Sequence, residues 1–313
     1  MIYVAHRLFA AHDRALAAAA AHQLARRVGT HRVFLPFCDT DEENLVADTK
    51  GRRLYELDQH RLSGLTGMLA ILHGPSLDDG VCMEIGYAAA LGVPVVLLTT
   101  DFITYAARLD GPATPFPDPI LSTVASAVVR VDRLADPPTS GKDDDRFTRF
   151  AARNKGTIAA AVERAVARLV SLTDADRGRT RTAGTNGRTA FCEPSPYWTD
   201  PTWPLITGEL RARGFELRTP HRFSTAADAH ADWAAVLQTD LLVVDVSGPE
   251  SPPGAAVMIG ACRALGRRVL VYQPIPTWTF ASGREPNWRN LMIQYAADGM
   301  FTDVTTLRQL LVP

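Results

Sequence analysis

Short apolar runs alternate along the chain with longer amphipathic or Ala-rich segments. Such runs, bounded by polar turns, are typical of strands buried on both faces of a parallel sheet, and the longer segments are typical of the helices that cover the sheet. In the first half, strands are predicted at residues 2–5, 33–36, 68–72, 93–98 and 128–131. Helices are predicted at 10–27, at 53–65, within 78–92 and at 146–172.

One loop and helix, residues 78–92, lies between two of these buried strands and is predicted to form a βαβ crossover. Ligands of open parallel sheets bind where the carboxyl ends of strands meet the following loops, which is where Asp78 and Glu84 fall. We expect Glu84 in or near the first helical turn, where backbone N–H groups favour an ionised carboxylate. Such a carboxylate can act as a nucleophile, although acidic residues are also common in first turns for the helix dipole alone.

The second half of the chain repeats the order of the first. Residues 189–192, 215–217 and 239–245 correspond to the first three strands, and 252–272 follows the loop, helix and strand that begin at Asp78. Glycines and the spacing from helix to strand are kept, although few other residues match. The sequence therefore predicts an α/β fold of two flavodoxin- or Rossmann-like doubly wound parallel-sheet units in tandem.

The boundary between the units is predicted from composition. Residues 174–188 contain almost no apolar side chains, as expected of a linker. We therefore expect a first unit at 1–172, a linker at 173–188 and a second unit at 189–313. A length of 313 residues also favours two domains over one.

Bulk composition narrows the class of protein. The net charge of −1 argues against a nucleic-acid or anionic-membrane partner, which usually selects a basic excess. No apolar run approaches the roughly 20 residues that span a bilayer, and Met1 leads directly into a strand, so a cytoplasmic protein is expected. The four cysteines are widely scattered and lack C-x-x-C or His spacing, so neither a disulfide framework nor a metal site is indicated.

Two motifs resemble one known enzyme family. Residues 78–95 read D-x-G-x-x-x-E-I-G-Y-A-x-x-x-G-x-P-V, and residues 2–9 read I-Y-V-A-H-R-L-F. Both resemble elements of the nucleoside 2-deoxyribosyltransferase family, in the same order and at about the same separation. His6 and Arg7 stand where many relatives carry small residues. The resemblance implies no cofactor and a small nucleoside or nucleotide as substrate.

The resemblance also implies roles for individual residues. Glu84 would be the nucleophile, and the Tyr3 hydroxyl would orient its carboxylate. Asp58 would lie near the base and protonate it or bind it through a hydrogen bond, while Asp78 would help to bind the base or sugar. Gly80 belongs to the substrate-binding loop. Without the family, Tyr3 reads as a core aromatic residue and Asp58 as a solvated helical residue.

The second unit lacks this chemistry, because Tyr3, Asp78 and Glu84 correspond to Phe191, Pro252 and Met258. It carries instead Asn290 and Met292, which resemble an N-x-M element that a neighbouring subunit inserts into the active site in this family. The first unit has Asp118 at the corresponding place.

These losses are complementary, so we expect an intramolecular pseudo-dimer with one complete composite site and an inert second site. Further association into a homo-oligomer is left open. The alternative is that Asn290 is a loop or helix-cap residue and the second unit only a structural partner.

Three functions remain open at this stage. The first is transfer of a deoxyribosyl or ribosyl group to another base through a covalent intermediate on Glu84, by the logic of a retaining glycosidase. The second is hydrolysis of a nucleoside 5′-monophosphate, in which Arg7 would bind the phosphate unless it is an ordinary surface arginine. His6 is a further candidate for the substrate-binding set, unless it caps the following helix. The third is an inactive nucleotide sensor.

Overall fold

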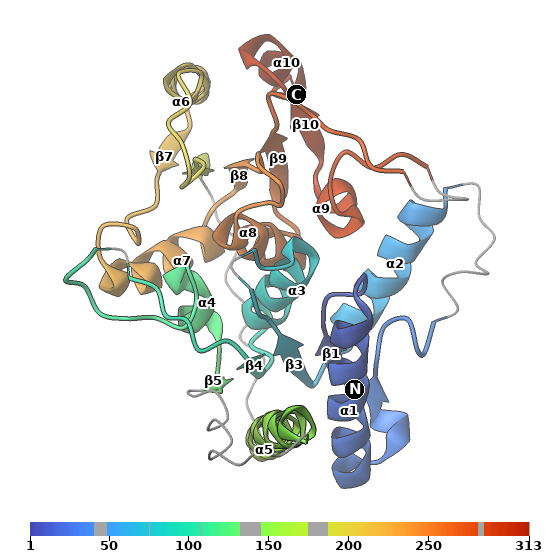
Figure 1. Cartoon of the computed structure of the whole chain (residues 1–313). Helices are drawn as coiled ribbons and strands as arrows, with labels where there is room; N and C mark the ends of the chain where they lie inside the picture. Colours follow the sequence, from blue (N-terminus) through green and yellow to red (C-terminus); the bar gives the residue numbers. More distant parts are fainter. Residues whose placement is uncertain are drawn as a thin grey trace.

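The computed structural model describes residues 1–40, 49–74, 76–106, 108–131, 145–174, 187–280 and 285–312. Most of the expected linker at 173–188 lies outside these residues. The described residues form two five-stranded parallel sheets flanked by helices, which confirms the predicted fold class (Figure 1).

The N-terminal sheet has the strand order β2-β1-β3-β4-β5. Its strands are β1 (Ile2–Ala5), β2 (Val33–Phe34), β3 (Gly67–Ile71), β4 (Val95–Thr99) and β5 (Ala127–Arg130). Its helices are α1 (Ala11–Val28), α2 (Lys50–Ser63), α3 (Asp79–Ala90), α4 (Pro119–Val124) and α5 (Arg146–Thr173). The direction of strand order reverses around β1 and β3, so the crevice at their carboxyl ends is the expected ligand site of such a sheet.

The C-terminal sheet repeats this topology in the order β7-β6-β8-β9-β10. Its strands are β6 (Thr189–Glu193), β7 (Glu216–Arg218), β8 (Leu241–Asp245), β9 (Arg268–Tyr272) and β10 (Gly299–Phe301). Its helices are α6 (Trp203–Ala212), α7 (Ala229–Leu237), α8 (Pro253–Ala264), α9 (Leu291–Ala296) and α10 (Val304–Leu310). Tyr3 pairs with Met68, and Phe191 pairs with Leu242, so Tyr3 and Phe191 hold matching positions in the two sheets.

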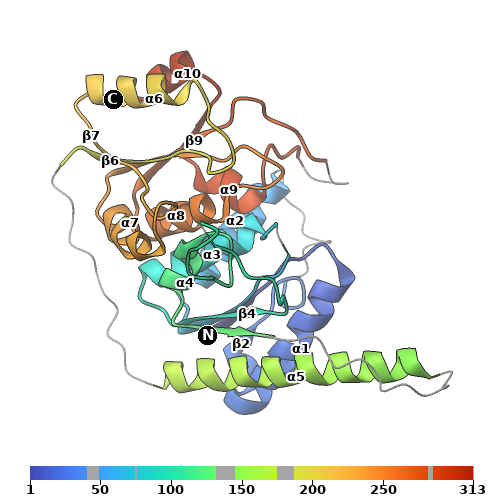
Figure 2. The same ribbon diagram turned by 60° about the vertical axis from the view of Figure 1, so that its left-hand side comes forward.

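Figure 2 shows the two sheets stacked in layers with their helices. Helices α1 and α5 cover the outer face of the N-terminal sheet, and α6 and α10 cover the outer face of the other. Between the sheets lie α2, α3 and α4 of one half and α7, α8 and α9 of the other (Figures 1 and 2). Buried residues of these inner helices form one hydrophobic cluster that spans both halves, so the two halves share a core.

The central contact is the packing of α3 on α8. Gly86 of α3 lies against the carbonyl of Val257, and Gly260 of α8 lies against the carbonyl of Met83. A Cβ atom at either glycine would overlap the facing backbone. Gly86 and Gly260 hold the same place along their helices, as do Met83 and Val257, so the contact is reciprocal. This is the pattern that a two-fold axis produces at an isologous interface.

Most predicted elements are found within a few residues of their expected bounds, and the differences have local causes. Helix α2 begins at Lys50 rather than at residue 53. The short helix α4 lies at the end of a segment expected to be loop, and it begins where Asp118 accepts a hydrogen bond from the Ile120 amide. A single turn capped in this way leaves almost no periodic signal in the sequence.

Candidate active site

A cavity of about 540 Å³ opens at the carboxyl ends of β1 and β3 and is lined by both halves of the chain. Of the nine residues predicted for the site, all but Arg7 line it: Tyr3, His6, Asp58, Asp78, Gly80, Glu84, Asn290 and Met292. The structure therefore brings together residues separated by almost the whole length of the chain.

Tyr3 and Glu84 form the central polar contact of the cavity. The Tyr3 hydroxyl donates a hydrogen bond of 2.7 Å to Glu84 Oε1, and both side chains are buried. Tyr3 is fixed in turn by its place in β1 and by packing of its ring against Phe34, with ring centroids 5.3 Å apart. The hydrogen bond fixes the orientation of the Glu84 carboxylate.

The sequence predicts Glu84 in or near the first turn of its helix, and the structure places it just beyond that turn. The N-cap of α3 is Asp78, so Glu84 is the sixth helical residue and lies in the second turn. The influence of a helix terminus falls off within the first turn, so the Tyr3 hydroxyl, rather than the helix dipole, is the nearest favourable partner of this carboxylate.

Asp78 begins α3 by accepting a hydrogen bond of 2.9 Å from the Val81 amide. Burial, and then the neighbouring carboxyl of Asp79, raises the pKa of Asp78 to about 7. The hydrogen bond from Val81 acts in the opposite direction but is outweighed. Near neutral pH a large fraction of Asp78 is therefore protonated and able to donate a proton into the cavity.

Asp79 was not singled out by the sequence motif, yet it joins the two halves at the cavity wall. Its Oδ2 accepts a hydrogen bond of 3.1 Å from the backbone amide of Ser251. Burial raises the pKa of Asp79, and the hydrogen bond from Ser251 opposes that rise. The contact ties the start of α3 to the loop that follows β8.

Arg7 lies behind the cavity lining and is engaged with acidic groups. Its guanidinium contacts Glu250 of the C-terminal half at 3.1 Å and Asp78 at 3.7 Å, and it donates to the carbonyl of Ser76. His6 lines the cavity with Nδ1 placed 3.2 Å from the Val4 carbonyl. Burial lowers the pKa of His6, which favours a neutral imidazole. The N-cap of α1 is Ala10, so His6 does not cap that helix.

The C-terminal half reaches the cavity through Asn290, the N-cap of α9. Its Oδ1 accepts a hydrogen bond of 3.0 Å from the Met292 amide, which leaves the side-chain nitrogen pointing elsewhere. That nitrogen lies 2.8 Å from the point where a Cβ atom on Gly80 would stand, so a larger residue at position 80 would displace it. Asn290 is thus both a helix cap and a cavity residue.

Several lining residues carry no motif that could have identified them. They are Glu250, Phe280, Trp288 and Arg289, all from the C-terminal half. Arg289 is buried and donates to the carbonyls of Gly248 and Pro249, so it holds the loop that carries Glu250. Only the proximity of Trp288 and Arg289 to Asn290 in sequence could have suggested a role.

Among the described residues, no three His, Cys, Asp or Glu side chains are grouped so as to hold a metal ion. Across the same part of the chain, no helix has both the length and the apolar character needed to cross a membrane. Cys82 is buried in α3, and burial raises the pKa of its thiol well above the usual value.

Comparison with known proteins identifies relatives of the N-terminal half. The sequence pattern of a family described as nucleoside 2-deoxyribosyltransferase matches residues 2–162, just over half of the chain. A crystal structure of a conserved protein from Enterococcus faecalis V583 is similar at 33% sequence identity, with 32% of this chain covered and a TM-score of 0.28. The chain spans 63% of the length of that protein. No curated protein matches.

Proposed function

Since the chain belongs to the nucleoside 2-deoxyribosyltransferase family, we propose that it cleaves the N-glycosidic bond of a nucleoside and transfers the glycosyl group to another base. The observation that carries the proposal is the Tyr3–Glu84 pair, buried in a cavity that also contains a carboxyl group with a pKa of about 7. Such a pairing of an oriented carboxylate with a neutral acid is what breaking a glycosidic bond requires.

In the first step, Glu84 bonds through a carboxylate oxygen to C1′ of the sugar while the bond from C1′ to the base nitrogen breaks. The departing base leaves poorly as an anion, so it takes a proton from a neutral acid as the bond breaks. The sequence favoured Asp58 for this role. Asp78 is the residue with the raised pKa, so we assign to it the donation of the proton. We assign to Asp58, which also lines the cavity, the binding of the base.

In the second step, a nitrogen of the incoming base attacks C1′ and the ester bond to Glu84 breaks. The incoming base loses its proton to the Asp78 carboxylate, which restores the starting state. Two displacements at C1′ give net retention of configuration, as in retaining glycosidases. Water in place of the second base would give hydrolysis.

We further propose that residues 1–172 and 189–313 are duplicated units, related by the reciprocal packing of α3 and α8. Asn290 before α9 and Asp118 before α4 are then equivalent, because each caps its helix and lies against the second residue of the other half's central helix, Gly80 or Gly254. The cavity with Glu84 has Asn290, whereas Asp118 faces the position of Met258. One chain therefore holds one working site.

The charges around the cavity favour an unphosphorylated nucleoside over a nucleoside 5′-monophosphate. Its described acidic lining residues are Asp58, Asp78, Asp79, Glu84 and Glu250. The only described Arg or Lys in the lining is Arg289, whose Nη1 donates to two backbone carbonyls while its buried Nη2 has no hydrogen-bond partner among the described residues. Even with Asp78 and Asp79 protonated, a phosphate dianion would meet more like charge than opposite charge. The contact of Arg7 with Glu250 supports the same choice.

A chromatographic assay tests the proposal. The protein is incubated with a panel of nucleosides and their 5′-monophosphates, with and without a second free base. We expect a new nucleoside only when the second base is present, and faster reaction of unphosphorylated substrates. Release of base without an acceptor would make the protein a hydrolase, and binding without turnover would make it a sensor.

Asn290→Ala is expected to lower kcat/KM by about 10- to 100-fold, the cost of losing a hydrogen bond to a buried substrate group. It should also cost about 1 kcal/mol of stability, because the cap of α9 is lost. Asn290→Asp is the matched variant, since it keeps the capping oxygen and replaces the side-chain nitrogen. If both variants turn over at the normal rate in the steady-state assay, Asn290 is only a helix cap.

The dependence of kcat/KM on pH should contain a descending limb near pH 7. Burial favours the neutral form of Asp78 and raises its pKa to about 7, so the proton donor is present below that pH and lost above it. The rate should then fall by about tenfold per pH unit on the alkaline side. Asp78→Asn should remove this limb and lower the maximum by roughly 10²-fold or more. A limb that persists in Asp78→Asn would assign the proton to another group.

A further inference from the structure

A second cavity, of about 530 Å³, lies at the place in the C-terminal half that corresponds to the candidate active site. Three of its walls match walls of that site. Pro196 follows β6 as Leu8 follows β1, and Phe223, Ser224, Thr225 and Ala227 lie between β7 and α7 as Pro36 lies between β2 and α2. The third wall in each case is the long loop of the opposite half, here residues 108–119 before α4.

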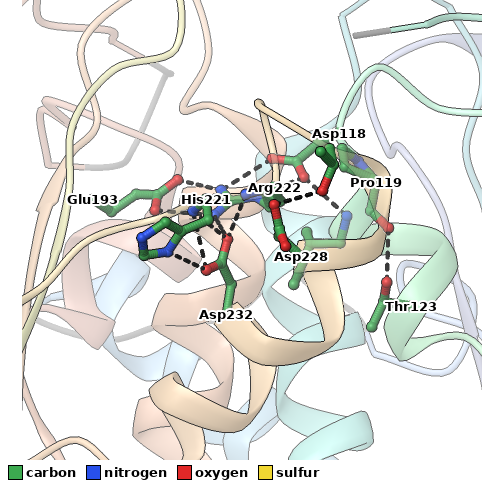
Figure 3. Close-up of polar contacts among 10 residues, drawn as sticks. Asp118, Pro119, Thr123, Glu193, His221, Arg222, Asp228 and Asp232 are labelled. Carbon is green, nitrogen blue, oxygen red and sulfur yellow. Dashed lines mark hydrogen bonds and ion pairs between the residues drawn. The ribbon is translucent and has the colours of Figure 1, made fainter. Parts of the chain in front are cut away.

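The fourth wall is missing. In the active-site cavity it is the N-terminal end of α3, from Asp78 to Glu84, but no residue of α8 lines the second cavity. The guanidinium of Arg222 lies against Gly254 of α8, and Figure 3 shows its contacts with the surrounding carboxylates. Its side chain is fully buried and bonds Asp118 through Nε at 2.9 Å and Nη2 at 3.2 Å. The same guanidinium bonds both carboxylate oxygens of Glu193.

Equivalent positions in the two halves show which part of the second site is occupied by the cluster of Arg222, Asp118 and Glu193. Asp118 corresponds to Asn290, which we propose holds the sugar, and the guanidinium of Arg222 lies against Gly254, the counterpart of Gly80. Glu193 is the last residue of β6, as Ala5 is the last residue of β1. The carboxylate of Glu193 forms an ion pair with Arg222. The cluster therefore fills the part of the second site that corresponds to the sugar pocket.

What remains open is the outer part of that site. Phe223 follows Arg222 directly, its ring lies 4.5 Å from the guanidinium carbon, and it lines the cavity. The hydroxyl-bearing residues Thr114, Ser224 and Thr225 line the same space. An aromatic ring with a few hydrogen-bonding groups and no adjacent sugar pocket suits a flat heterocycle.

We propose that this second cavity binds a free nucleobase without its sugar, separately from the active site. Arg222, Asp118 and Glu193 exclude the sugar, and the Phe223 ring provides the surface on which the base stacks. The choice of a nucleobase as occupant rests on the proposed function, since the cavity is the counterpart of the one in which we place the base of the substrate. No bond forms or breaks there.

The experiment is a calorimetric titration of the full chain with adenine, comparing the wild type with Ser224→Trp. Ser224 is exposed at the cavity wall, so an indole there fills the cavity without removing a buried contact. Ser171→Trp, on the exposed side of α5, is the matched control. We expect Ser224→Trp to bind one adenine fewer per chain than the wild type, while Ser171→Trp and the wild type bind the same number.

Nucleoside turnover of Ser224→Trp is measured in parallel and should match the wild type. An unchanged number of bound adenines in Ser224→Trp, or no adenine bound to the wild type, overturns the second site. The proposed function fails by a different result, the absence of turnover with every nucleoside in the panel. Loss of one bound adenine in Ser224→Trp supports the second site whether or not turnover is found.

Discussion

Glu84→Ala is expected to slow base exchange by at least about 10³-fold, because the reaction then loses the carboxylate that captures C1′. The substrate should still bind, since Asp58, Asp78 and Asn290 are unchanged. Intact-mass spectrometry of the wild type, quenched during turnover with a deoxynucleoside, should show a deoxyribosyl adduct on the chain. The same experiment with Glu84→Ala should show none.

Tyr3→Phe is the matched variant for this prediction. It keeps the ring packed on Phe34 but removes the hydroxyl that lies 2.7 Å from Glu84 Oε1. The variant should keep the adduct and lose about 10- to 100-fold in rate, since the carboxylate is retained but is no longer oriented. If Glu84→Ala retained a tenth or more of wild-type exchange, or still formed an adduct, the nucleophile would be another group.

Arg222→Met is expected to lower the free energy of unfolding by about 3–5 kcal/mol, the cost of leaving buried charge without its partner. Asp118 and Glu193 would lose their hydrogen bonds, and Asp232, which lies 3.6 Å from Arg222, would lose its nearest cation. Urea denaturation followed by circular dichroism gives the measurement. Because Arg222 belongs to the C-terminal half and Asp118 to the N-terminal half, the loss should appear as weaker docking of the two halves.

A pH series separates this explanation from a simple packing defect. Burial raises the pKa of Glu193 to about 7, although Arg222 opposes that rise. Without the arginine the Glu193 carboxyl should titrate at still higher pH, so the variant should recover stability as the pH falls from 7 towards 5. A loss that is the same at both pH values would show that the side chain matters only through its volume. Arg222→Lys keeps the positive charge but not the planar guanidinium. Its free energy of unfolding should lie between those of the wild type and of Arg222→Met.

The sequence predicted the fold and the N-terminal side of the site because both depend on local patterns. Buried parallel strands leave continuous apolar runs, and the spacing of Asp78, Gly80 and Glu84 is a short motif. The sequence predicts Glu84 only as in or near the first helical turn, because adjacent aspartates, Asp78 and Asp79, are both good N-caps and only the backbone shows which one begins the helix.

The cluster around Arg222 could not be predicted in the same way. Asp118, Glu193 and Arg222 come from three loops or strand ends far apart in the sequence, and each alone reads as an exposed charged residue. Likewise, Glu250 and Arg289 become cavity residues only because the C-terminal half docks over the N-terminal one. Contacts between halves are set by how α3 and α8 cross, and periodicity does not encode that crossing.

The cavity holds Tyr3, near the beginning of the chain, beside Asn290 and Met292, near its end. During synthesis α3 leaves the ribosome long before α8 and α9 do, and until then the face that packs on those two helices lacks them. A nascent or truncated chain with a folded N-terminal sheet would therefore carry Glu84 without the residues that hold the sugar. On the proposed roles, activity would be acquired only once Asn290 and Met292 have been made and docked, so shorter translation products would not cleave nucleosides.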